Sequence, residues 1–150
     1  MISVREAQIS DLSCIVDFQM AMAKETESLD LDRKVVVKGV KAVFRDSGKG
    51  KYYIAVAQNN KVIASLLITF EWSDWRNGNI YWIQSVYVLK EYRKQGVYKK
   101  MYREIQELVL NSQDLLGIRL YVDSKNLPAQ RVYEKLDMDG QHYRLFEWIK

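Results

Sequence analysis

The N-terminal part of the chain begins with strand-like and then helix-like spacing of its apolar residues. Residues 2–6, ISVRE, alternate between apolar and polar side chains, which predicts a strand. Ser10 and Asp11 follow and offer an N-cap for a helix. Apolar residues then recur at helical spacing from Leu12 to Ala23, so we expect a helix that ends in the polar segment 24–28.

The middle of the chain predicts a second helix and then three consecutive strands. Helical spacing of apolar residues runs from Val36 to Phe44 and stops before a Gly-containing turn. The β-rich runs at 51–58 and 61–72 are joined by an Asn-Asn pair, which tolerates positive φ in a tight turn, so we expect a hairpin. A further run rich in β-branched and aromatic residues, 80–89, extends the hairpin to a three-stranded meander.

The C-terminal part alternates between the two kinds of spacing. A helix is predicted from Val97 to Val109, a strand at 117–123, a short helix from Ala129 to Leu136 and a final strand at 142–149. No repeat or linker divides this order of elements. It predicts an α/β fold of mixed layers in a single domain over residues 1–150.

Composition is typical of a compact globular protein. Of the 150 residues, 48% are hydrophobic and 28% are charged, and the chain contains one Pro and seven Gly, which fits neither a disordered nor a fibrous chain. No apolar run approaches the roughly 20 residues that a membrane span needs. The first residues do not have the pattern of a secretory leader. We therefore expect a cytoplasmic protein without a membrane partner.

The scarcity of cysteine and histidine excludes two kinds of chemistry. Cys14 and His142 are each the only residue of their type, so an internal disulfide cannot form and a zinc site lacks ligands. We therefore expect no metal. Cys14 also falls among the apolar positions of the first predicted helix, which favours a buried thiol over a nucleophile.

The formal net charge of +4 favours anionic ligands. Five basic residues lie in one short stretch: Arg93, Lys94, Lys99, Lys100 and Arg103. A protein that binds duplex DNA usually spreads its charge along a face. We therefore expect a small anionic ligand and no nucleic-acid partner.

The segment 86–105 has the features of an anion site. A predicted strand passes through a polar turn with one glycine, Gly96, into an amphipathic helix. The first N–H groups of a helix have no internal acceptor and lie at the positive end of the helix dipole, so they can bind a phosphate. Gly96 lets the backbone approach it, and Arg93, Lys94 and Lys99 can neutralise further phosphate charge. The same residues also fit a solvated charge run, and neither a Walker loop nor a dinucleotide fingerprint is present.

Two motifs resemble the GNAT superfamily of acyl-CoA N-acyltransferases. Residues 93–98 fit most of the family's R/Q-x-x-G-x-G/A signature, and the preceding V-Y-V-L-K-E-Y resembles its V-x-P-x-Y approach. Downstream, Asn126, Ala129 and Tyr133 in NLPAQRVYEKL match its N-x-x-A-x-x-x-Y-E-K-L helix. The predicted order of elements also agrees with the family along essentially the whole chain.

Two positions depart from the family pattern. Tyr98 replaces the small residue that ends the first signature, and Leu136-Asp137-Met138 replaces the usual Leu-Gly-Phe. The Tyr98 side chain can point away from the pyrophosphate while its N–H still donates to it. The size of this side chain nevertheless affects how the cofactor fits.

The resemblance implies a central mixed, mostly antiparallel sheet flanked by helices, with acetyl-CoA bound where two parallel strands splay apart. Buried backbone groups without partners are costly, so such an opening indicates a ligand. The cofactor-binding residues that the resemblance implies are Val86, Tyr87, Val88, Arg93, Lys94, Gln95, Gly96, Val97, Tyr98, Lys99, Asn126, Ala129 and Tyr133.

The resemblance also implies an N-acetyltransferase in which a primary amine attacks directly in a ternary complex. Acetyl transfer needs a neutral amine, a polarised carbonyl and a proton for the leaving thiolate. Tyr133 is the implied general acid, although a core aromatic would show the same spacing. The N–H of Val88 is the implied carbonyl polariser. Glu71, Glu25 and Glu27 are candidate bases, and each also fits an exposed surface charge.

We expect the acceptor near the segments 24–35 and 70–79, which are acidic and aromatic and suit a cationic amine. The candidate substrate-binding residues are Glu25, Glu27, Trp72 and Gln84. Gln84 stands where some relatives carry an acidic base and cannot itself serve as one. The layout of residues 68–88 resembles the diamine acetyltransferase branch and points to a small, polyamine-like acceptor. A peptide N-terminus and a protein lysine remain open.

Two further possibilities follow from the same residues. In the alternative reading the chain binds acyl-CoA without catalysis, as a regulatory domain in which Tyr133 is structural. The strand predicted at 142–149 could pair with its copy in a homodimer, as edge strands do.

Overall fold

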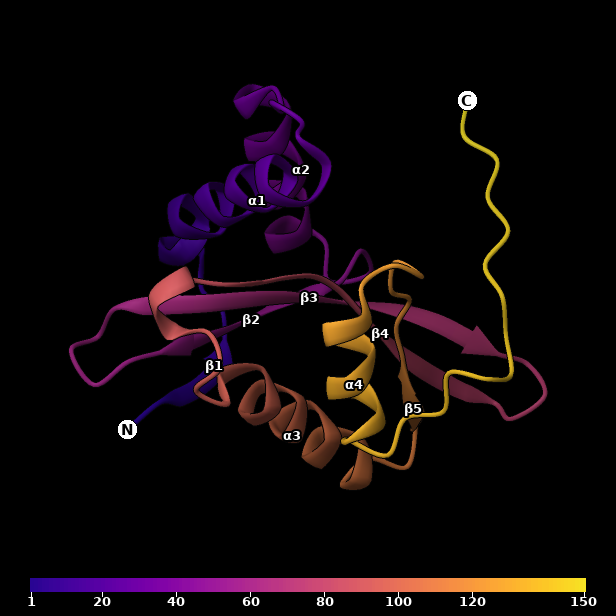
Figure 1. Ribbon diagram of the computed structural model, residues 1–150. Coiled ribbons are helices and arrows are strands. Elements are labelled where there is room, and N and C mark those ends of the chain that lie inside the picture. Colours follow the sequence, from indigo (N-terminus) through magenta and orange to yellow (C-terminus); the bar gives the residue numbers. More distant parts are fainter. The chain divides into compact units, whose positions relative to one another are not determined.

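The computed structural model describes all of residues 1–150, and the chain divides into two compact units, Met1–Arg119 and Leu120–Lys150. The prediction of a single domain over the whole chain stays a prediction. The second unit contains α4 (Leu127–Glu134). The first unit contains β1 (Ser3–Glu6), α1 (Leu12–Glu27), α2 (Arg33–Arg45), β2 (Lys51–Val56), β3 (Val62–Ser73), β4 (Gly78–Val88), α3 (Val97–Leu110) and β5 (Leu115–Arg119), with short 3-10 turns at Ile9–Asp11 and Lys90–Tyr92 (Figure 1).

The five strands form one mixed sheet in the order β1-β2-β3-β4-β5. Neighbouring strands from β1 to β4 are antiparallel, whereas β4 and β5 are parallel. The predicted meander of three consecutive strands is therefore confirmed. So is the mixed, mostly antiparallel sheet with one parallel pair that the family resemblance implied.

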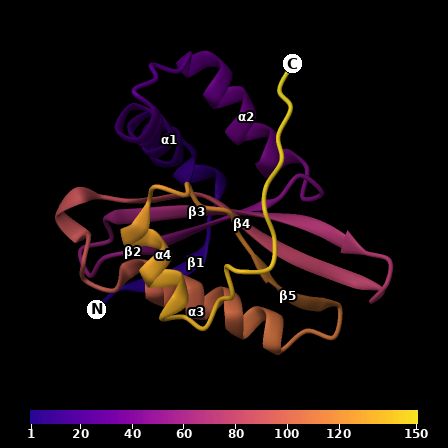
Figure 2. The same cartoon turned by 45° about the vertical axis from the view of Figure 1, so that its right-hand side comes forward.

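Helices cover both faces of this sheet. Tyr52 and Ile54 of β2 pack with Ile15 and Val16 of α1 and with Val40 of α2 in one buried cluster. The helix α3 contacts β1, β2 and β5, and its Met101 and Ile105 are fully buried. Figures 1 and 2 show α1 and α2 on one side of the sheet and α3 on the other. We call these the α1 face and the α3 face.

The predicted N-cap residue Asp11 forms other contacts instead of capping the first helix. Asp11 occupies the N-cap position, but its side chain does not cap the helix. Its carboxylate instead accepts hydrogen bonds from Arg5 Nη1 at 2.8 Å and from the Gln8 N–H at 2.7 Å. Burial raises the pKa of Asp11, but these hydrogen bonds outweigh it and hold the pKa below its ordinary value. The start of α1 is thereby joined to β1.

Several element boundaries differ from the predictions. The helix α1 continues through the polar segment to Glu27 and ends at Ser28, whose φ is 54°. Lys and Glu are good helix formers, so loss of apolar spacing alone does not end a helix. The strands β3 and β4 are longer than predicted at their hairpin. Conversely, β5 ends at Arg119, although the apolar pattern continues to residue 123.

The final strand predicted at 142–149 is wrong, because this segment contains no strand. Its apolar side chains are exposed, including Phe146 at 91% and Trp148 at 87%. Alternating polarity shows only that a segment is compatible with a strand, whereas a strand forms by pairing its backbone with a neighbour. The homodimer that rested on this strand stays a prediction. No helix in the chain is both long enough and apolar enough to span a membrane.

We predict that Ile105→Ala lowers the free energy of unfolding by about 2–5 kcal/mol, because it removes a fully buried side chain between α3 and the sheet. Urea denaturation followed by circular dichroism measures the change. Gln106→Ala is the matched control, since Gln106 is exposed on the same helix. Equal destabilisation by the two substitutions would contradict the packing of α3 described here.

Candidate functional site

An irregularity near the end of β4 reverses which residues of the strand face α1. Gln84 pairs with Leu67 and Tyr87 pairs with Ser65, so β4 contains one residue more than β3 across this interval. Ser85 has φ of 50°, outside the range of an ordinary strand. This is a β-bulge, which bends a strand and redirects the side chains that follow it. As a result Tyr87 lies on the α1 face, whereas without the bulge Val86 would lie there.

Beyond the bulge β4 has a strand neighbour on one side only. Its pairing with β5 runs from Asn79↔Leu115 to Trp82↔Arg119, where β5 ends, while β4 continues to Val88. The splaying that the resemblance implied corresponds to this end of the parallel pairing.

The backbone of Val88 is directed away from β3. On the β3 side, the Leu89 N–H donates to the Ile63 carbonyl at 2.9 Å. Hydrogen-bonded and non-bonded pairs alternate along an antiparallel ladder, so the pair Ala64↔Val88 is a non-bonded one. The N–H and C=O of Val88 therefore point to the open side. The C=O accepts a hydrogen bond from Arg93 Nε at 2.8 Å.

The turn that follows β4 presents an uncapped helix start. Lys94 and Gly96 have φ of 61° and 77°, and Gly96 is the N-cap of α3. Gly96 has no side chain with which to cap the helix, it is exposed, and a Cβ built on it would meet no atom within 4 Å. Lys94 and Lys99 are also exposed, while Val97 is 2% exposed and anchors the turn. The turn therefore combines a helix N-terminus, open space and positive charge.

The bulky Tyr98 departs from the motif but fits along the helix. Its ring lies beside that of Tyr102, one turn further on, with 6.4 Å between the ring centroids. Tyr98 is half-buried. Its ring thus lies along the surface of α3, next to Tyr102.

Glu25 joins the end of α1 to this turn. Its carboxylate accepts from Arg93 Nη2 at 2.8 Å and from the Tyr87 hydroxyl at 3.2 Å, and Lys90 Nζ lies 3.4 Å away. The Arg93 guanidinium also lies over the Tyr87 ring, 5.4 Å from its centroid. Two residues predicted for different roles, Glu25 for the acceptor and Arg93 for the cofactor, are therefore in contact.

The electrostatics of this cluster keep Glu25 ionised. The hydrogen bond from Arg93 lowers the pKa of Glu25, and the charges of Arg93 and Lys90 act in the same direction. Burial and the neighbouring carboxylate raise the pKa of Tyr87. Glu25 is consequently a poor acceptor for a proton at neutral pH.

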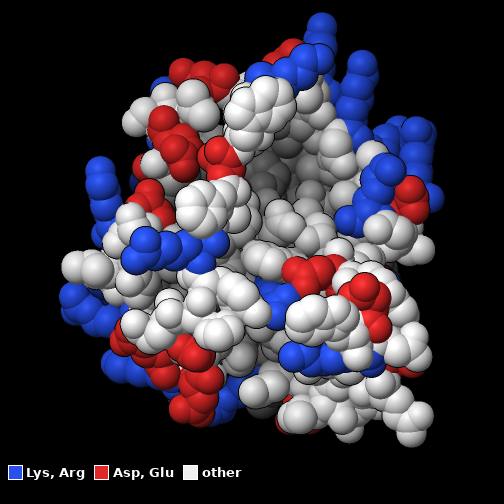
Figure 3. Space-filling view, turned by 90° about the vertical axis from the view of Figure 1, so that its right-hand side faces the viewer, with Lys and Arg blue, Asp and Glu red and all other residues white.

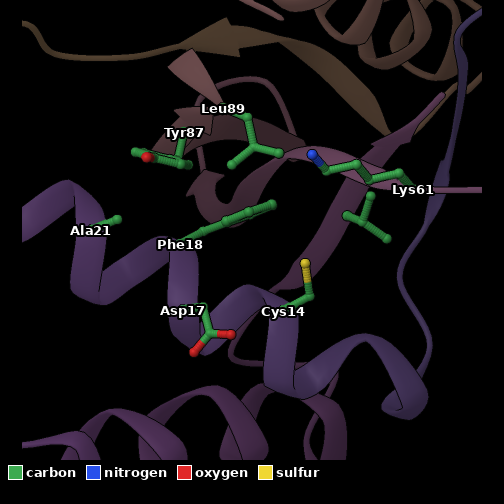
Figure 4. A pocket seen from close by; sticks show the side chains of 8 residues that line it. Cys14, Asp17, Phe18, Ala21, Lys61, Tyr87 and Leu89 are labelled. Carbon is green, nitrogen blue, oxygen red and sulfur yellow. The ribbon is translucent and has the colours of Figure 1, made fainter. Parts of the chain in front are cut away.

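A cavity of about 460 Å³ opens beside this cluster on the α1 face. It lies between α1 and the ends of β3 and β4, and Figure 4 shows Cys14 and Phe18 projecting from α1 toward Tyr87 and Leu89. Phe18 and Tyr87 are in ring contact at 5.2 Å between centroids. Burial raises the pKa of the Cys14 thiol, which keeps it protonated and argues against a nucleophile.

A second polar group lies on the α1 face farther along the sheet. Glu71 of β3 accepts a hydrogen bond from Trp82 Nε1 of β4 at 3.0 Å, and its other carboxylate oxygen forms an ion pair with Arg119 at the end of β5. In the next row, Gln84 Nε2 donates to the Thr69 hydroxyl. Five polar side chains on three neighbouring strands thus form a continuous patch: Thr69, Glu71, Trp82, Gln84 and Arg119.

The remaining acceptor candidates are not part of this patch. Trp72 follows Glu71 directly in β3, so its side chain projects to the α3 face, where it is 58% exposed. Glu27 is the last residue of α1 and is exposed.

In the second unit the motif residues lie on and next to α4. Asn126 is the N-cap, and its side-chain oxygen accepts from the Ala129 N–H at 3.2 Å. Tyr133 lies near the end of the helix and is half-buried, and burial raises the pKa of its phenol. Asn126 therefore caps α4.

Sequence reasoning missed two basic residues that the structure brings into these groups, Lys90 and Arg119. Arg119 had a recognisable signal, since it is the only charged residue within the apolar run GIRLYV. The predicted basic stretch at 93–103 also does not account for all of the exposed positive charge. Lys and Arg side chains project from the upper edge of the molecule in Figure 3, where α2 lies, and Lys34, Lys38 and Lys41 of α2 are exposed.

Comparison with known proteins agrees with this geometry. The chain is 28% identical to a thialysine N-epsilon-acetyltransferase of Bos taurus, over 97% of this chain and 92% of that one. It superposes on a possible acetyltransferase from Clostridium difficile 630 with a TM-score of 0.92 and 43% identity, covering 100% of this chain and 98% of the other.

A more distant structure shows the same fold. It is a predicted acetyltransferase with acetyl-CoA from Clostridium acetobutylicum, with a TM-score of 0.73 and 19% identity over 98% of this chain and 96% of that one. The model of the acetyltransferase (GNAT) family matches residues 18–138, which is most of the chain. The chain therefore belongs to the GNAT family of acetyltransferases.

Proposed function

We propose that the protein transfers the acetyl group of acetyl-CoA to a primary amine of a small molecule. The observation that supports this most directly is the pairing of an outward-directed Val88 backbone with an uncapped helix start at Gly96. The first can hold an acyl carbonyl and pantetheine amides, and the second can hold a diphosphate. Only a ligand with both groups would use both features.

The residues at this site fit acetyl-CoA, which members of the family use. The exposed turn 94–99 would hold the diphosphate through backbone N–H groups, and Lys94 and Lys99 would neutralise further phosphate charge. When bound, acetyl-CoA supplies an acetyl group activated as a thioester. The strand end from Val86 to Val88 would bind the pantetheine arm and direct the thioester toward the α1 face, where the acceptor candidates lie.

Two groups of the chain would act on the transfer itself. The Val88 N–H would donate to the carbonyl oxygen, where negative charge develops as the amine nitrogen attacks. The Tyr133 phenol would give its proton to the departing sulfur. The phenol is protonated at neutral pH at its ordinary pKa of 10.0, and burial, which raises that pKa, leaves it so.

The amine must lose a proton, and none of the carboxylates is well placed to take it. Glu25 is held ionised by Arg93, and both oxygens of Glu71 already accept hydrogen bonds. Gln84 cannot act as a base. We therefore propose that the proton leaves through water, and that Glu71 acts on the acceptor by binding it.

A small acceptor is supported by the similar bovine protein, whose activity is on the ε-amine of thialysine. The polyamine-like acceptor inferred from the sequence belongs to the same broad class. The competing function is acyl-CoA binding without transfer. Thiol release from acetyl-CoA in the presence of a panel of primary amines separates the two, because binding alone releases no thiol.

We propose for Arg93 a different task from the one that the motif suggests. Its side chain is engaged with the Val88 carbonyl and with Glu25, both within 2.8 Å. We propose that Arg93 positions the turn and the strand end relative to each other, while the lysines and backbone N–H groups bind phosphate. Glu25 then positions Arg93.

We predict that Gly96→Ala weakens binding of CoA about tenfold or more. Alanine is strained at positive φ, by about 1 kcal/mol, and its methyl group would project into the open space at the helix start. Isothermal titration calorimetry with CoA measures the loss. Gly39→Ala, a glycine replaced within α2 where a Cβ also meets nothing, should leave the affinity unchanged. Unchanged affinity of the Gly96 variant would place the diphosphate elsewhere.

We predict that Tyr133→Phe lowers kcat about 100-fold while the dissociation constant of CoA changes less than about threefold, because only the proton donor is lost. Thiol release and calorimetry on the same preparation measure the two quantities. A variant with full turnover would exclude Tyr133 as the general acid.

We predict that Glu25→Gln lowers the free energy of unfolding by up to about 1 kcal/mol at neutral pH. Because the folded-state pKa of Glu25 is lowered, its stabilising effect is complete above the ordinary carboxyl pKa of 4.5 and is lost as the pH falls through the folded-state value. Denaturant unfolding at pH 7 and at successively lower pH should show the difference from wild type shrinking. Glu27→Gln, at an exposed position on the same helix, should show no such difference at any pH.

A further inference from the structure

Lys90 carries a primary amine next to the strand end where the proposed function puts the thioester. It begins the 3-10 turn that follows β4 and is two residues beyond Val88. Two residues of backbone span at most about 7 Å, and a lysine side chain is of similar length. Its ammonium lies 3.4 Å from Oε1 of Glu25, at the end of α1. An amine of the chain itself is therefore on the face to which the thioester would be directed.

The pair of Glu25 and Arg93 connects this amine to Val88. Arg93 Nε donates to the Val88 carbonyl at 2.8 Å, and Arg93 Nη2 donates to Oε2 of Glu25 at 2.8 Å. Lys90 lies against the other oxygen of the same carboxylate. Only one guanidinium and one carboxylate therefore stand between the Lys90 nitrogen and the backbone of Val88 along this path.

Neutralisation of Glu25 does not explain the position of Lys90. Arg93 already forms a hydrogen-bonded ion pair with Glu25, and the Tyr87 hydroxyl donates to the same carboxylate. The distance of 3.4 Å from Lys90 is longer than the roughly 2.7–2.9 Å of a charge-assisted hydrogen bond. The Lys90 side chain is also 72% exposed, and ion pairs at exposed positions contribute little to stability. The Lys90 amine is thus held loosely enough to turn toward a ligand.

The other lysines near this end of the sheet are engaged or stand at the phosphate turn. Lys24 lies 2.9 Å from each oxygen of a neighbouring carboxylate. Lys61 donates to a carboxylate of the 3-10 turn at 3.0 Å. Lys94 and Lys99 are on the turn where the proposed function puts the diphosphate. Among these lysines, Lys90 alone combines a loosely held amine with a place beside the strand end.

We infer that Lys90 is a site of self-acetylation, to which the protein transfers the acetyl group when no acceptor is bound. This rests on the proposed acetyl transfer and adds a modification site to it. The lone pair of the neutral Lys90 amine attacks the carbonyl carbon, an amide bond forms, and the carbon–sulfur bond breaks with its electron pair on sulfur. The sulfur takes the proton of Tyr133. The proton lost by the amine passes to water, from which the phenol regains one.

The modification removes the charge of Lys90 and leaves the pair of Glu25 and Arg93 intact. The acetylated chain therefore keeps the connection between α1 and the turn that begins α3. It also presents one positive charge fewer to an acceptor. Because the amine and the strand end belong to one molecule, the step is intramolecular, and its rate per molecule does not depend on protein concentration.

Incubation of the purified protein with acetyl-CoA alone, followed by peptide mass mapping, tests the inference. Lys90 should gain an acetyl group about tenfold or more faster than Lys38, because only Lys90 is held beside the reacting carbon. Lys38 is an exposed lysine of α2 and reports the background reaction of acetyl-CoA with lysine side chains. The rate at Lys90 should stay the same when the protein is diluted.

Two variants separate folding and cofactor binding from the chemistry. Lys90→Arg keeps a positive charge beside Glu25, so its thermal unfolding should match that of wild type, while the rapid gain of one acetyl group in the intact mass is lost. Gly96→Ala, which is predicted to weaken binding of CoA, should slow labelling of Lys90 but not of Lys38. Equal labelling of the two lysines in wild type, or a rate that rises with protein concentration, would overturn the inference.

The covalent mark and the turnover of free amines are independent readouts. If free amines are acetylated but Lys90 is labelled no faster than Lys38, the proposed function stands and this inference fails. If Lys90 is labelled but added amines release no thiol beyond the equivalent that the protein takes, self-acetylation stands and the small acceptor fails. If neither occurs in protein that binds CoA by calorimetry, both fail.

Discussion

The site depends on one constraint, the early end of the pairing between β4 and β5. Up to Trp82 the two strands share a parallel ladder, and after it β4 continues to Val88 with β3 as its only strand neighbour. A central strand normally has its backbone groups satisfied on both sides, so this open stretch is where a ligand with amide and carbonyl groups can add to the sheet. The rest of the proposed mechanism follows from that opening.

Around the opening, charge serves to hold loops in place as well as to attract ligands. Arg93 binds the last carbonyl of β4, and Glu25 binds Arg93 from the end of α1. The turn that begins α3 is therefore connected both to the sheet and to the helix on the α1 face. In the proposed mechanism the exposed lysines at 94 and 99 would bind phosphate, so the basic residues of one short motif would divide between structural and binding roles.

The sequence predicted the elements well where the spacing of apolar residues reflects packing, and poorly where geometry is set by pairing. The buried face of α3 followed from the helical periodicity of residues such as Met101 and Ile105, and the meander from β2 to β4 followed from three runs rich in β-branched and aromatic residues. The bulge at Ser85 has no such signal, because a serine in a strand does not reveal a positive φ. The segment 142–149 shows the opposite error, since a good alternating pattern found no partner strand. The contacts between Glu25 and Arg93 and between Glu71 and Arg119 join distant parts of the chain, and a single sequence contains no information on such pairs.

The extra residue at the bulge also determines which side chains of β4 lie on each face of the sheet. Before the bulge, the even-numbered residues Trp82 and Gln84 lie on the α1 face. After it, the odd-numbered residues Tyr87 and Leu89 lie there. Loss of one residue here would send the Tyr87 phenol to the opposite layer and bring two valines beneath α1. A substitution in β4 changes one side chain, whereas an insertion or deletion between Gln84 and Tyr87 exchanges the two faces of the strand beside the proposed cofactor site.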